Sequence, residues 1–192
     1  MLGIDSFLDS EQFNETDFIR MAKEERSVTD ATLIRYLSKG IAFPLNSKFR
    51  PKAKTVETLL QHGARPWLIA NGDWNILFAE DVRIALPKPF RSSLNLAITL
   101  GDVSIVDILL KYGDVPNSYT YKLVSAPKIA KLLTGTRVYP NTTDFDYLLN
   151  KLKDTAREFK SEVIEVLQVY LESNLSIESS SVDRFLDLYQ AQ

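Results

Sequence analysis

The 192-residue sequence contains no cysteine and only one histidine, His62. The lack of cysteine excludes a disulfide scaffold, a thiolate zinc site, an iron–sulfur cluster and a cysteine nucleophile. A Ser-His-Asp site or a histidine-led metal site would have to use His62. Because His62 directly precedes a glycine that is predicted to end a helix, we expect it to cap that helix or face solvent.

Glycines are few and dispersed, and long apolar runs are absent. The seven glycines never cluster, which excludes a loop whose backbone amides enclose a phosphate. No apolar run approaches the roughly 18 residues of a membrane span, and the first residues lack the features of a secretory signal. The acidic pair Asp144 and Asp146 opens a predicted helix, where carboxylates favour the positive end of the dipole. We expect an intracellular protein, cytoplasmic or nuclear, with no cofactor, no metal, no membrane contact and no enzymatic activity.

Charge is distributed unevenly, although the net charge is only −2. Residues 1–30 hold eight acids and three bases, a net charge of −5. Residues 31–143 hold seven acids and fifteen bases (+8), and residues 144–192 hold ten acids and five bases (−5). A basic middle between acidic ends indicates compensation within the fold, ordinary solvated faces, or a centre that binds an acidic partner.

The dominant periodicity is helical, and several predicted helices end in the same way. Leucine occupies the third position before Gly40, Gly63, Gly113 and Gly135, and proline follows three of these glycines after three or four residues. Glycine readily adopts the left-handed conformation that ends helices, and proline prevents the helix from continuing. Successive helices that each end at a glycine are typical of an α-solenoid.

Residues 91–117 combine two short apolar helices, a glycine turn between them and a glycine-proline connection after them. This pattern resembles one ankyrin repeat, which implies stacked helical hairpins that bind another protein. Ser92-Ser93 replace the Thr-Pro that opens the family's first helix, and Asn95 replaces its histidine. The matching positions are Leu94, Ala97 and Gly101 in the first helix and its turn, Ile105, Val106, Leu109 and Leu110 in the second helix, and Gly113 to Asn117 in the finger.

Poorer copies surround this segment, so that the resemblance covers residues 29–135. Residues 62–66 resemble the end of another repeat, and Leu77 lies where the next first helix would place its leucine. Residues 41–54 lack the apolar spacing of a first helix, and residues 119–135 keep only the helix end. We therefore identify the chain as a divergent ankyrin-repeat protein.

The fold predicted from these patterns is all-α, an irregular α-solenoid of ankyrin-like hairpins with capping helices at both ends. Apolar residues between Phe145 and Tyr170 recur at three- and four-residue steps, which predicts one amphipathic helix or a broken pair. Ser181 is a candidate cap for a last short helix. The C-terminal helices either seal the open end of the solenoid or form an interaction element. The predicted segments are an acidic N-terminal cap at 1–28, ankyrin-like repeats at 29–143 and an acidic C-terminal cap at 144–192.

The strongest charged candidate for binding lies in a stretch without acids between Asp30 and Glu57. Four cations alternate with other residues within seven positions, and an aromatic residue stands among them. Such a segment pairs with phosphates or with a carboxylate-rich partner, acts as a weak nuclear-import signal, or is a solvated loop. The four cations are Lys48, Arg50, Lys52 and Lys54.

Trp67 and Trp74 are the only tryptophans, and both fall in a connection that corresponds to a finger. An exposed tryptophan next to Arg65 would be a plausible hot spot for partner binding. Trp74 begins an apolar helical spacing and is more simply a core residue. We therefore place Arg65 and Trp67 with the basic segment as the predicted partner-binding residues.

The favoured function is a non-catalytic module that binds a partner protein along the concave side formed by first helices and fingers. The basic middle would attract an acidic surface of that partner. The alternative is a nucleic-acid or ribonucleoprotein adaptor, which the acidic ends disfavour. An enzyme is disfavoured because no nucleophile–base pair or phosphate loop occurs. The alternative would use residues 31–56 together with Lys122, Lys128, Lys131 and Arg137.

Overall fold

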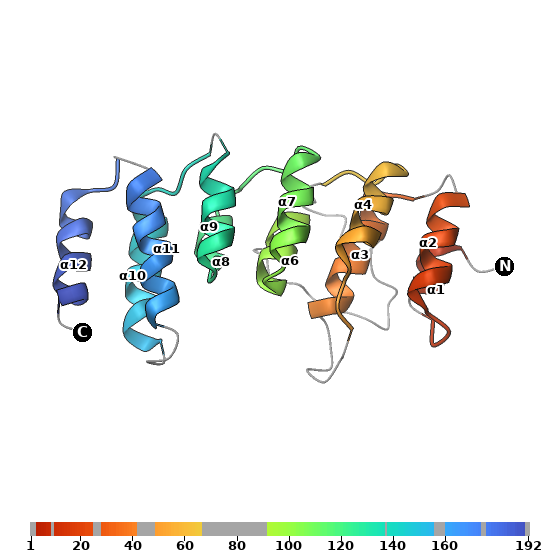
Figure 1. The fold of residues 1–192 in the computed structure, drawn as a ribbon, viewed down its shortest axis with the longest axis horizontal. Coiled ribbons are helices and arrows are strands. Elements are labelled where there is room, and N and C mark those ends of the chain that lie inside the picture. Colours follow the sequence, from red (N-terminus) through yellow and green to blue (C-terminus); the bar gives the residue numbers. More distant parts are fainter. Residues whose placement is uncertain are drawn as a thin grey trace. The chain divides into compact units, whose positions relative to one another are not determined.

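The structure is a computed structural model, and its regular elements are all helices (Figure 1). The prediction of an all-α fold is confirmed for the described residues, among which no β-strand occurs. No helix among the described residues is long and apolar enough to cross a membrane. The chain divides into two compact units, Met1–Asp114 and Val115–Gln192. The described residues are 3–8, 10–24, 28–41, 49–66, 92–136, 138–155, 160–173 and 176–190.

The described helices of the first unit form two rows and three pairs. In one row α3 packs between α1 and α6, and in the other α4 packs between α2 and α7. Across the rows, α1 contacts α2, α3 contacts α4, and α6 contacts α7. The first row consists of α1 (Ile4–Leu8), α3 (Asp30–Ile41) and α6 (Ser93–Leu100), and the second of α2 (Glu15–Glu24), α4 (Ala53–Gln61) and α7 (Val103–Lys111).

Apolar side chains from both rows make the core of this unit. Leu37 on α3, Leu59 on α4, Leu94 on α6 and Leu109 on α7 are fully buried. Each side chain of this kind contributes about 1.5–3 kcal/mol through removal of its surface from water. The helical apolar periodicity of the sequence therefore corresponds to real packing faces.

The pair α6–α7 follows from local sequence. Ser92 caps α6, since its side chain accepts a hydrogen bond of 3.1 Å from the N–H of Asn95. Asp102 caps α7 in the same way, and its carboxylate accepts a bond of 3.0 Å from the N–H of Ile105. Between the helices Gly101 has a φ of 71°, a left-handed conformation that suits glycine. Ser92 thus supplies a helix cap although the Thr-Pro of the resembled family is absent.

Two of the four predicted helix-ending glycines adopt the left-handed conformation. Gly63 has a φ of 120° and Gly113 a φ of 92°. After α7, the N–H of Asp114 donates a bond of 3.0 Å to the carbonyl of Leu109, five residues earlier. This bond is the one expected when a glycine closes a helix in a Schellman motif.

The other two glycines do not act as predicted. Gly40 lies inside α3, which continues to Ile41. A Cβ atom at Gly40 would lie 2.4 Å from Cδ of Pro51, so its role is to admit a close neighbour rather than to end the helix. Gly135 does follow the last residue of a helix, but with a φ of −71°, which any residue can adopt.

The second unit contains a short helix pair, a longer pair and a final helix. α8 contacts α10, α9 contacts α11, and α10 contacts both α11 and α12. The apolar pattern from Phe145 to Tyr170 is therefore a broken pair of helices. Ser181 is not the cap of the last helix, because that helix begins at Ser179 and Ser181 is buried within it. The helices are α8 (Thr120–Leu123), α9 (Pro127–Thr134), α10 (Thr142–Asp154), α11 (Lys160–Ser173) and α12 (Ser179–Gln190).

Candidate partner-binding site

The start of α4 is fixed against α2 and α3 by one carboxylate. Glu15 on α2 accepts hydrogen bonds from the hydroxyls of Tyr36 on α3 and Thr55 on α4. The Tyr36 oxygen also accepts a hydrogen bond of 2.8 Å from the backbone N–H of Lys52. Tyr36 and Thr55 are fully buried, so the backbone that carries Lys52 has a defined position.

Tyr36 keeps its proton in this arrangement. Burial raises the pKa of its hydroxyl well above the usual range, and the hydrogen bond to Glu15 raises that pKa further. A neutral hydroxyl donates to Glu15 and accepts from Lys52 at the same time. The network is therefore structural, and it links three helices at the point where the basic segment begins.

Three predicted cations surround the N-terminal end of α4. Arg50, Lys52 and Lys54 are exposed, and Lys48 lies outside the described residues. The N-terminal end of a helix carries partial positive charge, and the first turn of α4 has no acid of its own, although the carboxylate of Glu15 on α2 is hydrogen-bonded to it. The ion pairs found in the described part of the chain involve neither Lys52 nor Lys54.

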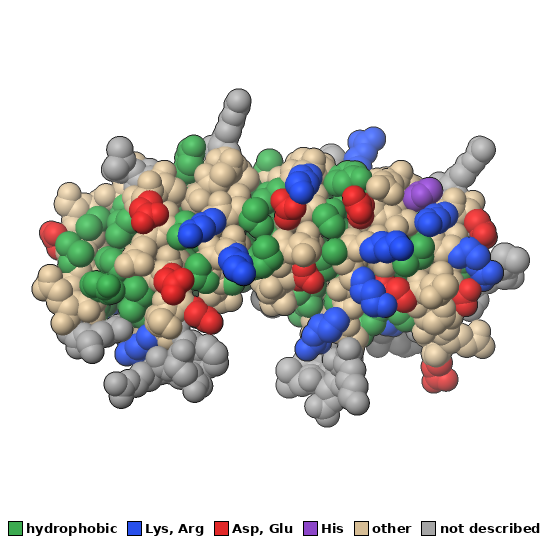
Figure 2. Space-filling view, in the orientation of Figure 1, with side chains coloured by type: hydrophobic (Ala, Val, Ile, Leu, Met, Phe, Trp, Pro, Cys, Tyr) green, Lys and Arg blue, Asp and Glu red, His purple; other side chains and the backbone are tan. Residues whose placement is uncertain are grey.

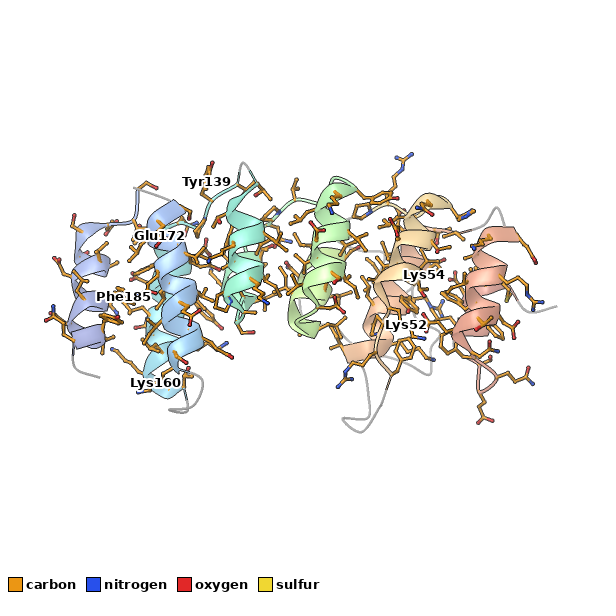
Figure 3. All side chains as sticks on the ribbon, viewed as in Figure 1. Lys52, Lys54, Tyr139, Lys160, Glu172 and Phe185 are labelled. Carbon is orange, nitrogen blue, oxygen red and sulfur yellow. The ribbon has the colours of Figure 1, made fainter. Side chains whose placement is uncertain are left out.

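Positive charge extends from this point over the same face of the unit. Lys52 and Lys54 are labelled at the start of α4 in Figure 3. Figure 2 shows further basic side chains over α2 and α4, with acidic side chains among them. The helix end and the side chains together therefore make a region that would attract a carboxylate or a phosphate.

The remaining predicted residues lie elsewhere. Arg65 is exposed beyond the other end of α4, where its backbone N–H donates a bond of 2.6 Å to the carboxylate of Asp30. Since α4 has nine residues, about 13 Å of helix separates its two ends. Trp67 and Trp74 lie outside the described residues. The structure therefore keeps Arg65 apart from Lys52 and Lys54.

Lys52 and Lys54 also lie in the row of second helices, whereas the binding surface expected from sequence was formed by first helices and fingers. α4 is the second helix of its pair and packs between α2 and α7. Lys52 and Lys54 lie at its beginning, next to the connection from α3, whereas Arg65 follows its end. A partner that contacts the lysines would therefore meet the second-helix row of this unit.

The candidates for catalysis occupy helix ends. His62 is the exposed C-cap residue of α4, as its position before Gly63 predicted. Asp144 and Asn141 form a capping box at the start of α10, with bonds of 3.0 and 3.1 Å between each side chain and the other's N–H. Burial raises the pKa of Asp144, and the hydrogen bond from Asn141 partly offsets this. In the part of the chain that the structure describes, no group of three or more His, Asp or Glu residues could hold a metal ion.

Two features of the structure were not anticipated from sequence. One is the Glu15 network, which joins residues that are up to 40 positions apart. The other is a set of exposed tyrosines in the second unit, which includes Tyr119 and Tyr139. The available signal for the second was the occurrence of tyrosines in a stretch without acids between Asp114 and Asp144.

The sequence and the structure were also compared with known proteins. No protein-family model matches the chain, and neither the curated proteins nor the solved structures give a significant match.

Proposed function

We propose that this protein is a non-catalytic protein-interaction module, an irregular stack of ankyrin-like helical hairpins that binds an acidic segment of a partner protein. Three helix pairs that pack in two rows among the described residues support the stack in the first unit. The left-handed glycines after α4 and α7 and the pattern of residues 91–117 support the resemblance to ankyrin repeats.

The observation that carries the binding proposal is the pair of exposed lysines at the start of α4, Lys52 and Lys54, which are in none of the ion pairs of the described residues. Lys52 and Lys54 stand where the helix dipole is already positive, and cations placed there cost about 0.3–1 kcal/mol of helix stability. A carboxylate from a partner would offset both the side-chain charges and the dipole. The lysines thus contribute to binding rather than to the stability of the helix that carries them.

The fixed backbone strengthens this site. The N–H of Lys52 is bonded to Tyr36, and Thr55 is bonded to Glu15, so little backbone order has to be gained when a partner binds. A site that is ordered before binding loses less entropy on association. Only the long lysine side chains would have to be immobilised.

The test compares two variants with the same change in charge. Lys52→Glu/Lys54→Glu alters the proposed site, and Lys151→Glu/Lys153→Glu alters two exposed lysines with the same spacing on α10. Affinity enrichment from cells followed by mass spectrometry should lose the same protein with the first variant and keep it with the second. A fluorescein-labelled acidic peptide taken from that protein should bind at least about tenfold more weakly to the first variant. Equal partner sets and equal affinities for both variants would overturn the proposal.

The alternative function, a nucleic-acid adaptor, is tested by a salt titration with the same acidic peptide. Labelled oligothymidylate and the acidic peptide are titrated against the wild-type protein over a series of salt concentrations. A polyanion releases many counterions, so a steep loss of affinity with salt for oligothymidylate, without comparable peptide binding, would favour the adaptor. Exposed Glu57 on α4, close to the lysines in sequence, favours a peptide instead.

A further inference from the structure

Two loops of the second unit expose large apolar side chains. One loop precedes α8 and carries Val115, 62% exposed, and Tyr119, 40% exposed. The other joins α9 to α10 and carries Val138, 39% exposed, and Tyr139, 51% exposed. Apolar side chains that are exposed as a set mark interaction surfaces more often than single ones do. We call these four residues the tyrosine loop surface.

The two loops are held together by a buried tyrosine. Tyr121 is 2% exposed, and its hydroxyl donates hydrogen bonds to the backbone carbonyls of Val138 and Leu133. Tyr121 follows Tyr119 by two residues, and Val138 directly precedes Tyr139, so this contact ties the backbone that follows Tyr119 to the loop that carries Tyr139. Negative charge on Tyr139 would contribute to the raised pKa of Tyr121, which is consistent with this proximity.

Local hydrogen bonds further fix the loop before α8, and a buried proline lies in each of the two loops. The N–H of Asn117 donates a bond of 2.8 Å to the hydroxyl of Thr120, and the N–H of Tyr119 donates one of 3.0 Å to the side chain of Asn117. Pro116 and Pro140 are buried. Tyrosine contributes a large contact area with few rotatable bonds, and ordered loops lower the entropy cost of binding. The surface is therefore organised before a partner arrives.

The segment of the chain that carries this surface is basic, which favours an acidic ligand. Between Asp114 and Asp144 the chain holds four cations and no acid. Lys128 and Lys131 are exposed on α9, and the charge of Lys122 is close enough to Asp144 to offset part of the rise that burial causes in the pKa of that carboxyl. Charge complementarity thus points to carboxylates on the partner.

Two neighbouring acids argue for a peptide rather than a nucleic acid. Glu172 lies on α11 at the same end of the unit as Tyr139 (Figure 3). The exposed Glu178 follows, and its N–H donates a bond of 3.2 Å to the hydroxyl of Thr142 at the start of α10. A peptide can place its acids near Lys128 and Lys131 and away from these glutamates. A nucleic-acid strand cannot, because it carries a phosphate at every nucleotide.

We propose that the tyrosine loop surface binds a short acidic peptide segment of a partner protein, with an apolar side chain of that segment packed between Tyr119 and Tyr139. This inference rests on the proposed function, because it also takes the chain to be a protein-binding module. Its residues are distinct from Lys52 and Lys54 at the start of α4. It assigns the second unit its own binding surface.

The experiment selects peptides on the full chain. A phage-displayed library of short random peptides is enriched on the wild-type protein, and the strongest sequence is synthesised with a fluorescein label. Enriched peptides should contain acids and at least one large apolar residue. The double variant Tyr119→Ala/Tyr139→Ala should weaken binding by at least about tenfold, as expected for aromatic anchors. The matched control is Tyr147→Ala/Tyr189→Ala, since both side chains are 50% exposed but lie outside the surface.

Each outcome decides the inference. Equal loss of affinity in both tyrosine variants, or enrichment of peptides without acids, would overturn it. If the affinity for the selected peptide falls only with Lys52→Glu/Lys54→Glu, the inference is overturned and the proposed function stays intact. If the affinity falls with none of the variants, both the inference and the proposed function are contradicted. Binding of oligothymidylate that requires Tyr119 and Tyr139 would assign the surface to nucleic acid, and a dimer in sedimentation that the same variant abolishes would assign it to a second copy. Circular dichroism of each variant checks that the fold is retained.

Discussion

The hydroxyl of Tyr170 donates a hydrogen bond of 2.8 Å to the backbone carbonyl of Tyr121, and the two rings meet edge-on with centroids 5.5 Å apart. Both side chains are almost completely buried, so their phenols are held away from water at the centre of the second unit. Burial raises the pKa of Tyr121 to about 12 and raises the pKa of Tyr170 well above its usual value. The centre of this unit therefore depends on phenols that stay protonated.

We predict that the free energy of unfolding falls as the pH rises above about 10, the pKa of tyrosine in an unfolded chain. Above this value the unfolded state loses the phenol protons while the folded state keeps them until its own, higher pKa is reached. A pKa of about 12 for Tyr121 corresponds to a loss of at most about 3 kcal/mol. Urea unfolding over a pH series measures this slope.

The control for the alkaline prediction removes one of the two phenols. Tyr121→Phe should be less stable than wild type at neutral pH, because its hydrogen bonds to Val138 and Leu133 are lost. Its stability should nevertheless decline less steeply above about pH 10, since one titrating group is gone. Identical alkaline slopes for both proteins would show that Tyr121 is not protected in the folded state.

The network around Glu15 yields a second prediction. Tyr36→Phe keeps the stacked contact with Phe18, whose ring centroid lies 5.5 Å away, but removes the hydroxyl that bonds Glu15 and Lys52. The half-buried Glu15 carboxylate and the N–H of Lys52 would each lose a partner, which should cost about 1–3 kcal/mol. Chemical denaturation measures the change, with Tyr189→Phe on the exposed side of α12 as a control of negligible effect. A loss under about 0.5 kcal/mol for Tyr36→Phe would mean that water replaces the hydroxyl without penalty.

The sequence predicted those features that depend on neighbouring residues. The left-handed conformations at Gly63 and Gly113 follow from helix-end patterns within a few residues, and the structure confirms them. The capping role of Ser92 is equally local, but it was not predicted, because Ser92 was interpreted only as a departure from the Thr-Pro of the resembled repeat. The all-helical fold of the described residues was predictable because a helical apolar period recurs in several separate segments of the chain.

Features that depend on tertiary contacts could not be predicted in this way. Arg65 and the lysines were grouped because they are close in sequence, but a helix of nine residues stands between them. The exposure of Tyr119 and Tyr139, as opposed to the burial of Tyr121, depends on which side chains the packed helices cover. No spacing of tyrosines along the chain distinguishes these two environments.

Gly40 shows the same limit and provides the last prediction. In an exposed helix interior, replacement of glycine by alanine stabilises by about 1 kcal/mol, because alanine has the higher helix propensity. At Gly40 the added Cβ would lie 2.4 Å from Cδ of Pro51, 2.7 Å from its Cγ and 3.0 Å from a methyl carbon of Leu100. Overpacking of this kind costs about 1–3 kcal/mol, so Gly40→Ala should be destabilising despite its better propensity. Gly3→Ala, where no atom lies within 4 Å of the new Cβ, should leave the midpoint of thermal unfolding nearly unchanged. A stabilised Gly40→Ala variant would mean that α3 and Pro51 do not approach each other this closely.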